Sequence, residues 1–181
     1  MASDSGSTRS IWVETDVTPR YSKLDRDTGA DVCVVGAGIS GLTTAYLLAV
    51  AGKRVVVVDD GEVGGGETGR TTAHITPVLD DRYFEIERLP GEKNARLAYE
   101  SHKAALDRIE QIVKSERIDC DFVRLDGYLF LHEKDTAETL DRELEAAGKA
   151  GLAAERVERA PLTSFDTGPA LRFSRQAEFH P

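Results

Sequence analysis

The stretch that decides the fold runs from Asp31 to Asp60 and reads DVCVVGAGISGLTTAYLLAVAGKRVVVVDD. It begins and ends with short valine-rich runs, at 31–35 and 54–59, which are typical of parallel strands buried on both faces. Between them, Ile39 to Ala51 is rich in helix formers, and Gly52 follows as a suitable C-terminal cap. Strand, helix and strand in about 30 residues predict one βαβ unit.

The turn between the first strand and the helix is a complete G-x-G-x-x-G. Gly36 lets the chain leave the strand tightly, and Gly38 lets the backbone approach a pyrophosphate with no Cβ in the way. Gly41 allows the helix to pack closely on the strand, and the helix presents free N–H groups and its positive dipole end to the phosphates. The candidate cofactor-binding residues of this glycine turn are therefore Gly36, Ala37, Gly38, Ile39, Ser40 and Gly41.

An acidic residue stands at the end of the second predicted strand. Asp59 lies 23 positions after Gly36, where a carboxylate accepts hydrogen bonds from a ribose and repels a 2′-phosphate. Asp60 is the second candidate for this role. A chance Gly-rich turn and a surface acid at a strand end are the alternatives, and the complete context favours a Rossmann-like dinucleotide site.

A second Gly-rich loop follows directly, from Gly61 to His74, and reads GEVGGGETGRTTAH. Its backbone amides and hydroxyls can line an extended ligand, while Arg70 can neutralise part of a diphosphate. A long helical pattern comes next instead of a third βα unit, which favours FAD over NAD. A flexible surface loop, an NAD-binding dehydrogenase and a non-catalytic nucleotide-binding fragment are the alternatives.

The rest of the chain mixes helices and strands. Helical periodicity predicts a long helix from Pro90 to about Arg117. An Asp-Gly turn signal between two apolar runs predicts a hairpin over 121–133. Asp135 with Glu138 indicates the start of another helix, which we expect to end before Gly148.

Composition excludes several classes of function. A formal net charge of −9 without a basic stripe argues against a nucleic-acid partner. No apolar run reaches the roughly 18 residues that a membrane-spanning helix needs. Cys33 and Cys120 are isolated and form no metal-ligand pattern, so we expect no metal and a cytoplasmic location. The first ten residues are small and polar and are expected to be disordered.

With both loops in place, the sequence resembles the D-amino-acid oxidase/glycine oxidase-type FAD-dependent oxidoreductases. The resemblance rests on the βαβ segment and on GGGETGRTTAHIT at 64–76. It is to a bacterial subgroup that opens with a segment like Trp12 to Thr15 and contains a helix like ESHKAALDRIE, Glu100 to Glu110. The likeness covers about residues 10–181, and its second loop is far more specific than its glycine turn.

The resemblance implies FAD as cofactor and an amine, amino acid or related C–N compound as the small-molecule substrate. Hydride would pass to flavin N5, with oxygen or another acceptor reoxidising the flavin, and no catalytic acid or base is identifiable. It implies that Gly36, Gly38 and Gly41 hold the pyrophosphate and that Asp59 holds the ribose. The residues that match the second phosphate- and ribityl-contacting loop are Gly66, Thr68, Gly69 and Arg70. Those expected near the flavin ring are Thr71, Thr72, Ala73 and His74.

His74 is the titratable group to watch at the ring. It is a candidate proton shuttle or flavin attachment point, and a merely structural histidine is the alternative.

The fold class expected is α/β, a Rossmann-like FAD/NAD(P)-binding βαβ domain with the start of a second α+β substrate domain. The expected limits are an N-terminal arm at 1–28, the FAD-binding domain at 29–120 and the beginning of the substrate domain at 121–175. Residues 176–181 are expected to lead back toward the FAD-binding domain. Family members run considerably longer, and this subgroup often ends with a Rieske domain. We therefore expect an incomplete chain that is inactive alone, or a degenerate remnant without activity.

Overall fold

The computed structural model describes residues 10–15, 19–88, 91–132 and 134–181. The disorder expected at the start of the chain falls mainly on 1–9, which lie outside the described residues. The chain divides into two compact units, a first unit of residues 1–72 with Pro181 and a second unit of residues 73–180. The limits expected from the sequence for the FAD-binding and substrate domains differ from this division, and they stay a prediction.

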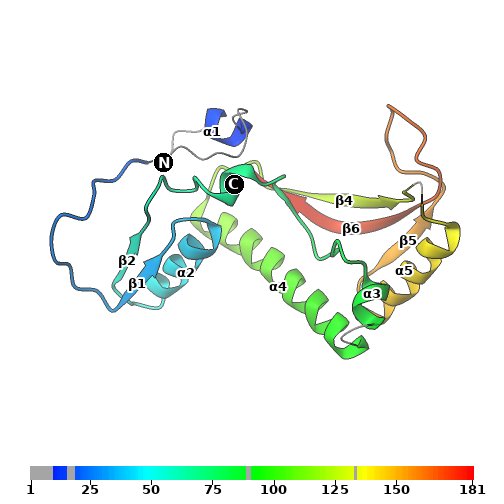
Figure 1. The fold of residues 1–181 in the computed structure, drawn as a ribbon, viewed down its shortest axis with the longest axis horizontal. Coiled ribbons are helices and arrows are strands. Elements are labelled where there is room, and N and C mark those ends of the chain that lie inside the picture. Colours follow the sequence, from blue (N-terminus) through cyan, green and yellow to red (C-terminus); the bar gives the residue numbers. More distant parts are fainter. Residues whose placement is uncertain (1–9, 16–18, 89–90, 133) are drawn as a thin grey trace. The chain divides into compact units, whose positions relative to one another are not determined.

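The first unit contains the predicted βαβ arrangement (Figure 1). Strands β1 (Val32–Val35) and β2 (Val55–Val58) pair in parallel, in a register that sets Val32 opposite Val55 and Val35 opposite Val58. Helix α2 (Ile39–Val50) connects them, and Gly52 behind it has a φ of +80°. The sequence prediction of one βαβ unit is therefore confirmed. The other two elements of this unit are the short helix α1 (Ile11–Thr15) and the 3₁₀ helix η1 (Glu67–Arg70).

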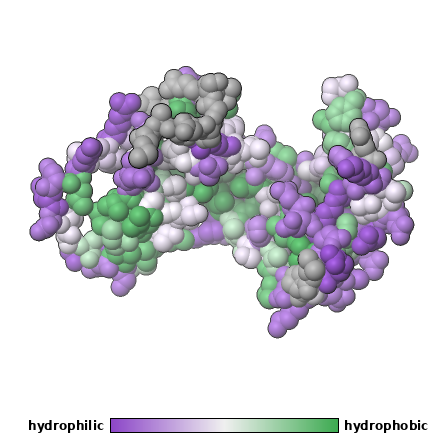
Figure 2. Space-filling view, in the orientation of Figure 1, coloured by the Kyte–Doolittle hydropathy of each residue, from purple (hydrophilic) through white to green (hydrophobic). Residues whose placement is uncertain are grey.

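Apolar side chains remain exposed on the βαβ arrangement. Val35 is 83% exposed and Val50 is 64% exposed, while Ala37 and Ala45 are among the few buried residues. Figure 2 shows these apolar side chains gathered over β1 and α2. A parallel sheet is normally covered on both faces. Among the described residues of the first unit, α2 is the helix that packs on β1 and β2.

The second unit is built on an antiparallel sheet around one long strand. Strand β6 (Ala170–Glu178) pairs with β4 (Val123–Phe130) on one side. On its other side, β5 (Ala154–Val157) pairs with the beginning of β6 and β3 (His74–Ile75) with its end.

The predicted hairpin over 121–133 is wrong, because this segment forms the single strand β4, with Gly127 inside it. Its partner β6 lies far along the sequence, so pairing in the folded sheet overrides the local Asp-Gly turn signal. The register shifts between Leu125 and Gly127, which marks a β-bulge, and the side chain of Gln176 lies against Gly127.

Three helices complete the second unit: α3 (Tyr83–Arg88), α4 (Glu92–Glu116) and α5 (Ala137–Ala150). The buried core includes Tyr83, Leu140 and Phe173. Helix α4 confirms the predicted long helix to within about two residues.

The predicted limits of α5 need correction at both ends. Its N-cap is Thr136 and not the predicted Asp135. The Thr136 amide donates a hydrogen bond to the Thr139 hydroxyl at 3.2 Å. The helix continues past Gly148 to Gly151, which takes the left-handed conformation with φ of +95°. A helix accommodates an internal glycine, whereas the C-terminal position needs a positive φ that glycine adopts without strain.

Candidate dinucleotide site

The glycine turn, residues 36–41, continues the parallel pairing and then reverses the chain. The Gly36 amide donates to the Val58 carbonyl at 2.8 Å, and Gly36 itself has a φ of +105°. A Cβ at Gly41 would lie 1.9 Å from the Gly36 carbonyl oxygen. Helix α2 therefore sits so close to the turn that only glycine fits at Gly41, as the spacing of the motif predicts.

The N-terminus of α2 faces the second loop, residues 61–74. Gly38 is the N-cap and has extended backbone, and it has no side chain that could cap the helix. The Ile39 amide donates to the Thr68 hydroxyl at 3.0 Å. A Cβ at Gly38 would lie 3.2 Å from that same hydroxyl oxygen. Backbone donors, a missing Cβ and a hydroxyl thus converge at the positive end of a helix dipole.

The second loop is fastened to the glycine turn at another point as well. The Gly64 amide donates to the Ala37 carbonyl at 2.9 Å. The chain then passes Gly66, around which a Cβ would find open space, and enters η1. A Cβ at Gly69 would lie 3.0 Å from the Gly64 carbonyl oxygen, so the loop is folded tightly on itself.

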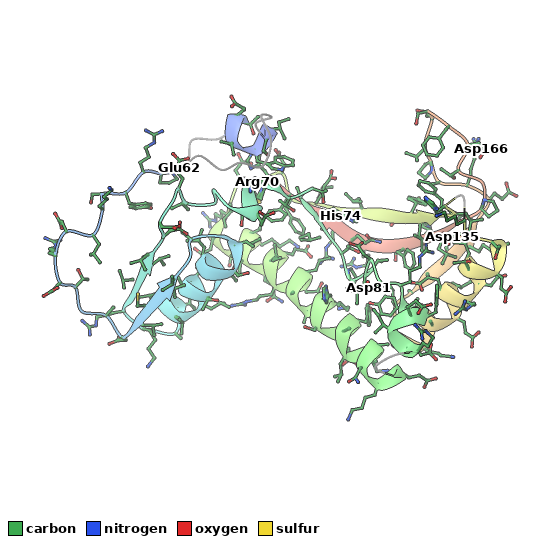
Figure 3. The ribbon with its side chains drawn as sticks, viewed as in Figure 1. Glu62, Arg70, His74, Asp81, Asp135 and Asp166 are labelled. Atoms are coloured by element: carbon green, nitrogen blue, oxygen red, sulfur yellow. The ribbon has the colours of Figure 1, made fainter. Side chains whose placement is uncertain are left out.

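Arg70 ends η1 and forms an ion pair with Glu67 at 3.2 Å, in which the Arg70 side chain is 39% exposed and the Glu67 side chain 92% exposed (Figure 3). An exposed pair of this kind contributes little to stability.

Asp59 ties the end of β2 to the glycine turn. One carboxylate oxygen accepts a hydrogen bond from the Ala37 amide at 2.6 Å, and the other accepts one from the Gly61 amide at 2.7 Å. The bond from Ala37, followed by the bond from Gly61, lowers the pKa of Asp59 below its usual value. The side chain is exposed and stays ionised at neutral pH. Asp60 is exposed next to it.

The residues predicted near the flavin ring fall on both sides of the division between the units. Thr71 and Thr72 belong to the first unit, and the Thr71 carbonyl accepts a hydrogen bond from the Trp12 indole at 2.9 Å. Ala73 and His74 belong to the second unit. Ala73 is buried with a φ of +64°, and His74 is exposed at the start of β3 opposite Glu178 (Figure 3).

Trp12 is the contact that sequence reasoning missed. In the sequence, Trp12 counts only as part of the segment that carries the family resemblance, and its hydrogen-bond partner lies 59 residues away. A further signal is that it is the only tryptophan of the chain. A large aromatic ring with a polar N–H favours a half-buried contact of this type.

The donor set fits a dinucleotide. Amides at a helix N-terminus suit a diphosphate, an unobstructed Gly38 permits its approach, and an ionised carboxylate suits a ribose. Among the described residues, no group of three or more His, Cys, Asp or Glu could hold a metal ion. Within the same residues, every helix is too short or too polar to cross a membrane.

Comparisons with known proteins show the family of the chain. The family model described as DAO, FAD dependent oxidoreductase, matches residues 31–181. The chain is 36% identical over 170 residues to the putative Rieske 2Fe-2S iron-sulfur protein YhfW of Bacillus subtilis, an alignment covering 94% of this chain and 33% of that protein. It is 29% identical over 160 residues to the gamma-glutamylputrescine oxidoreductase of Escherichia coli, covering 85% and 37%.

A solved structure shares the fold at low sequence identity. The L-amino acid deaminase of Proteus myxofaciens, in complex with anthranilate, superposes with a TM-score of 0.69 at 17% identity, covering 96% of this chain and 37% of that one. The chain thus spans about a third of the length of the curated relatives it matches, which are covered to 33% and 37%.

Proposed function

Because this chain belongs to the DAO family of FAD-dependent oxidoreductases, we propose that its first unit binds the ADP half of FAD in an enzyme that oxidises C–N bonds. FAD is the cofactor of the family. The single observation that carries the proposal is the meeting of the two loops at the N-terminus of α2, where the Ile39 amide and the Thr68 hydroxyl lie 3.0 Å apart. The family match gives no support to the alternative of an NAD-dependent dehydrogenase.

The glycine turn would hold the diphosphate. The Gly36 and Ala37 amides already donate within the protein, to the Val58 carbonyl and to Asp59. The donors to the diphosphate would therefore come from Gly38 and the first turn of α2, at the positive end of the helix dipole. Thr68 would offer its hydroxyl at the same place, since it already lies against the first amide of the helix. Arg70, whose present ion pair is exposed and weak, would add a positive charge.

Asp59 would bind the adenosine ribose. Its two oxygens already accept amides from Ala37 and Gly61, yet an ionised carboxylate has about four acceptor sites and can accept ribose hydroxyls as well. Its negative charge disfavours a 2′-phosphate, so the site should distinguish ADP-containing ligands from their 2′-phosphorylated forms. Asp60 is the second candidate for this contact.

The later part of the second loop would meet the rest of the cofactor. Gly66 and Gly69 would let backbone approach the second phosphate and the ribityl chain, and the segment 71–74 would lie near the flavin ring. His74 is exposed and would be the candidate proton shuttle of this segment, because an imidazole ring can both donate and accept hydrogen bonds.

The second part of the proposal is the substrate class. When bound, FAD supplies a hydride acceptor at N5 and passes the electrons to oxygen or another acceptor. An amine or amino acid as substrate is supported by the gamma-glutamylputrescine oxidoreductase and L-amino acid deaminase among the similar proteins. A cytosolic location is supported by two cysteines that form no disulfide.

Equilibrium binding tests the cofactor half of the proposal. The purified chain is titrated with FAD, with ADP-ribose and with 2′-phospho-ADP-ribose, by fluorescence or calorimetry. We expect FAD and ADP-ribose to bind and the 2′-phosphorylated ligand to bind at least tenfold more weakly, at about the cost of one charge-assisted hydrogen bond. Equal affinity for the two ADP-riboses, or a folded chain that binds neither FAD nor ADP-ribose, would reject the site.

Anaerobic reduction tests the substrate half. The protein, isolated from cells that express it, is mixed under nitrogen with amines, amino acids and the matching 2-hydroxy acids. Loss of the yellow flavin absorbance with a C–N substrate, and none with the hydroxy acids, is the expected result. Reduction by the hydroxy acids alone would assign a different substrate class while leaving the FAD site intact.

A further inference from the structure

Helix α1 contacts the second loop through Trp12. The indole Nε1 donates to the Thr71 carbonyl at 2.9 Å, across 59 residues of sequence. Trp12 is half-buried, whereas its neighbours Ile11 and Val13 are 62% and 43% exposed. An indole N–H is a donor only, so this bond fixes the ring in one orientation toward the loop.

A second contact of α1 lies on the same loop. The Cγ2 atom of Val13 is 3.5 Å from the position a Cβ would occupy at Gly69. Helix α1 therefore contacts η1 and the residue that follows it, and Figure 1 shows the two elements side by side within the first unit. The glycine at Gly69 permits this approach, since a side chain there would meet both Val13 and the Gly64 carbonyl.

The far side of the loop contacts the candidate diphosphate site. Thr68, within η1, accepts the Ile39 amide at 3.0 Å, and Gly64 donates to Ala37 at 2.9 Å. A four-residue 3₁₀ helix has little stability of its own, so its position depends on what it contacts. One face of this loop is held by α1 and the other meets α2.

We propose that α1 holds the second loop in its cofactor-binding position and that Trp12 is a positioning residue for FAD, acting through Thr71 and η1 without contacting the cofactor. This inference rests on the proposed function, because the loop is the part that would contact FAD. Removing the Trp12 contact should leave the amides of α2 in place and release Thr68 from its position beside the Ile39 amide.

Amide hydrogen exchange and FAD titration of the whole chain test the proposal together. The variants are Trp12→Leu, which removes the aromatic ring and the donor, and Trp12→Phe, which keeps a smaller aromatic ring without the N–H. Tyr21→Leu is the matched control, because Tyr21 is an aromatic residue of the same arm that is 79% exposed. Exchange at β1 and β2 reports unfolding of the first unit, exchange at β6 reports unfolding of the second, and we expect neither to change in any variant.

In Trp12→Leu, we expect exchange over 64–72 to rise about fivefold and the Kd for FAD to rise about fivefold, the worth of one net hydrogen bond. Trp12→Phe should show a smaller rise in both, and Tyr21→Leu and the β6 amides should not change. Unchanged exchange over 64–72 overturns the proposal, and so does faster exchange with an unchanged Kd. A wild-type chain that takes up no FAD overturns the proposed function instead, and the exchange rates then still decide whether α1 orders the loop.

Discussion

The carboxylate of Asp59 accepts a hydrogen bond from the Ala37 amide at 2.6 Å, so the end of β2 is joined to the turn that follows β1. The same side chain accepts the Gly61 amide at 2.7 Å, at the beginning of the second loop. One carboxylate therefore organises both segments of the candidate site. Its role in the free protein is structural, and any contact with a ribose adds to it.

Replacing Asp59 by Asn tests this double role. The amide side chain has one acceptor oxygen in place of two and no charge, so one of the two backbone amides loses its partner. We expect the Kd for ADP-ribose to rise tenfold or more, as for the loss of a charge-assisted hydrogen bond. Asp60→Asn is the comparison, because Asp60 is the second candidate, and we expect it to raise the Kd less than Asp59→Asn does. An Asp59→Asn protein that binds ADP-ribose like wild type would remove Asp59 from the site.

The same carboxylate sets a pH dependence for ligand binding. The pKa of Asp59 is lowered in the folded chain, so the ionised carboxylate contributes to ligand binding at every pH above its unfolded pKa of about 3.9. This contribution is lost as the pH falls further, through the folded pKa. We expect the Kd for ADP-ribose to be flat from about pH 8 to pH 5 and to rise only below about pH 4. A midpoint near pH 6 in a calorimetric pH series would contradict this assignment.

Gly38 and Gly41 should respond differently to alanine. A Cβ at Gly41 meets the Gly36 carbonyl oxygen at 1.9 Å, so α2 must move, and we expect both folding of the first unit and FAD binding to suffer. A Cβ at Gly38 meets only the Thr68 hydroxyl, at 3.2 Å, which a rotation of Thr68 relieves. Gly38→Ala should therefore keep its melting temperature and lose FAD affinity.

Thermal unfolding and FAD titration of the two variants, side by side, provide the comparison. If Gly38→Ala binds flavin as tightly as wild type does, the hypothesis that the phosphate approaches the backbone at Gly38 is wrong. The reading of Gly41 as a packing residue fails if Gly41→Ala melts no lower than Gly38→Ala.

Glu143 is a completely buried carboxylate that caps α3. It accepts the amides of Tyr83 at 3.0 Å and of Phe84 at 3.2 Å. Desolvation raises its pKa, and the bonds from Tyr83 and Phe84 oppose this only in part. Because the pKa of Glu143 is higher in the folded than in the unfolded chain, its contribution to the free energy of unfolding is fully present below the unfolded pKa of about 4.3. That contribution is lost as the pH rises through the folded pKa.

Glu143→Gln removes that titration. The stability of wild type relative to Glu143→Gln should be greatest below about pH 4 and should decline as pH rises, when followed by thermal unfolding. Glu138→Gln, an exposed position on the same helix, should leave the pH profile of wild type unchanged. Glu143→Leu leaves two amides without an acceptor and should cost about 2–4 kcal/mol. A wild-type advantage that grows with pH would reverse the assignment.

Gly127 and Gly148 form a matched pair for alanine substitution. A Cβ at Gly127 would lie 2.3 Å from the buried side chain of Gln176, so we expect Gly127→Ala to destabilise the second unit by about 1–3 kcal/mol. Gly148 is exposed inside α5 with open space around it, so Gly148→Ala should stabilise by about 0.5–1 kcal/mol. Denaturant unfolding measures both, and equal effects of the same sign would contradict the packing argument.

Local sequence signals were sufficient to predict the fold where strands that are close in the sequence pair with each other. The βαβ arrangement of 31–60 has its strands, helix and glycine turn where the pattern predicts them, because strand pairing and helix packing there involve neighbouring segments. The same signals were misleading at Gly127. A strand partner nearly 50 positions away decided that an Asp-Gly pair would be part of a bulged strand and not a turn.

The sequence by itself determined which residues are available to the candidate site: the glycines of the turn, an acid at the end of the second strand, and a second Gly-rich loop. Tertiary structure alone decided how these parts meet. It brought Thr68 to the Ile39 amide, turned Asp59 toward Ala37 and set Trp12 on Thr71. Glycine spacing follows from local backbone sterics, whereas contacts between distant segments depend on how the whole chain packs, which no short sequence window encodes.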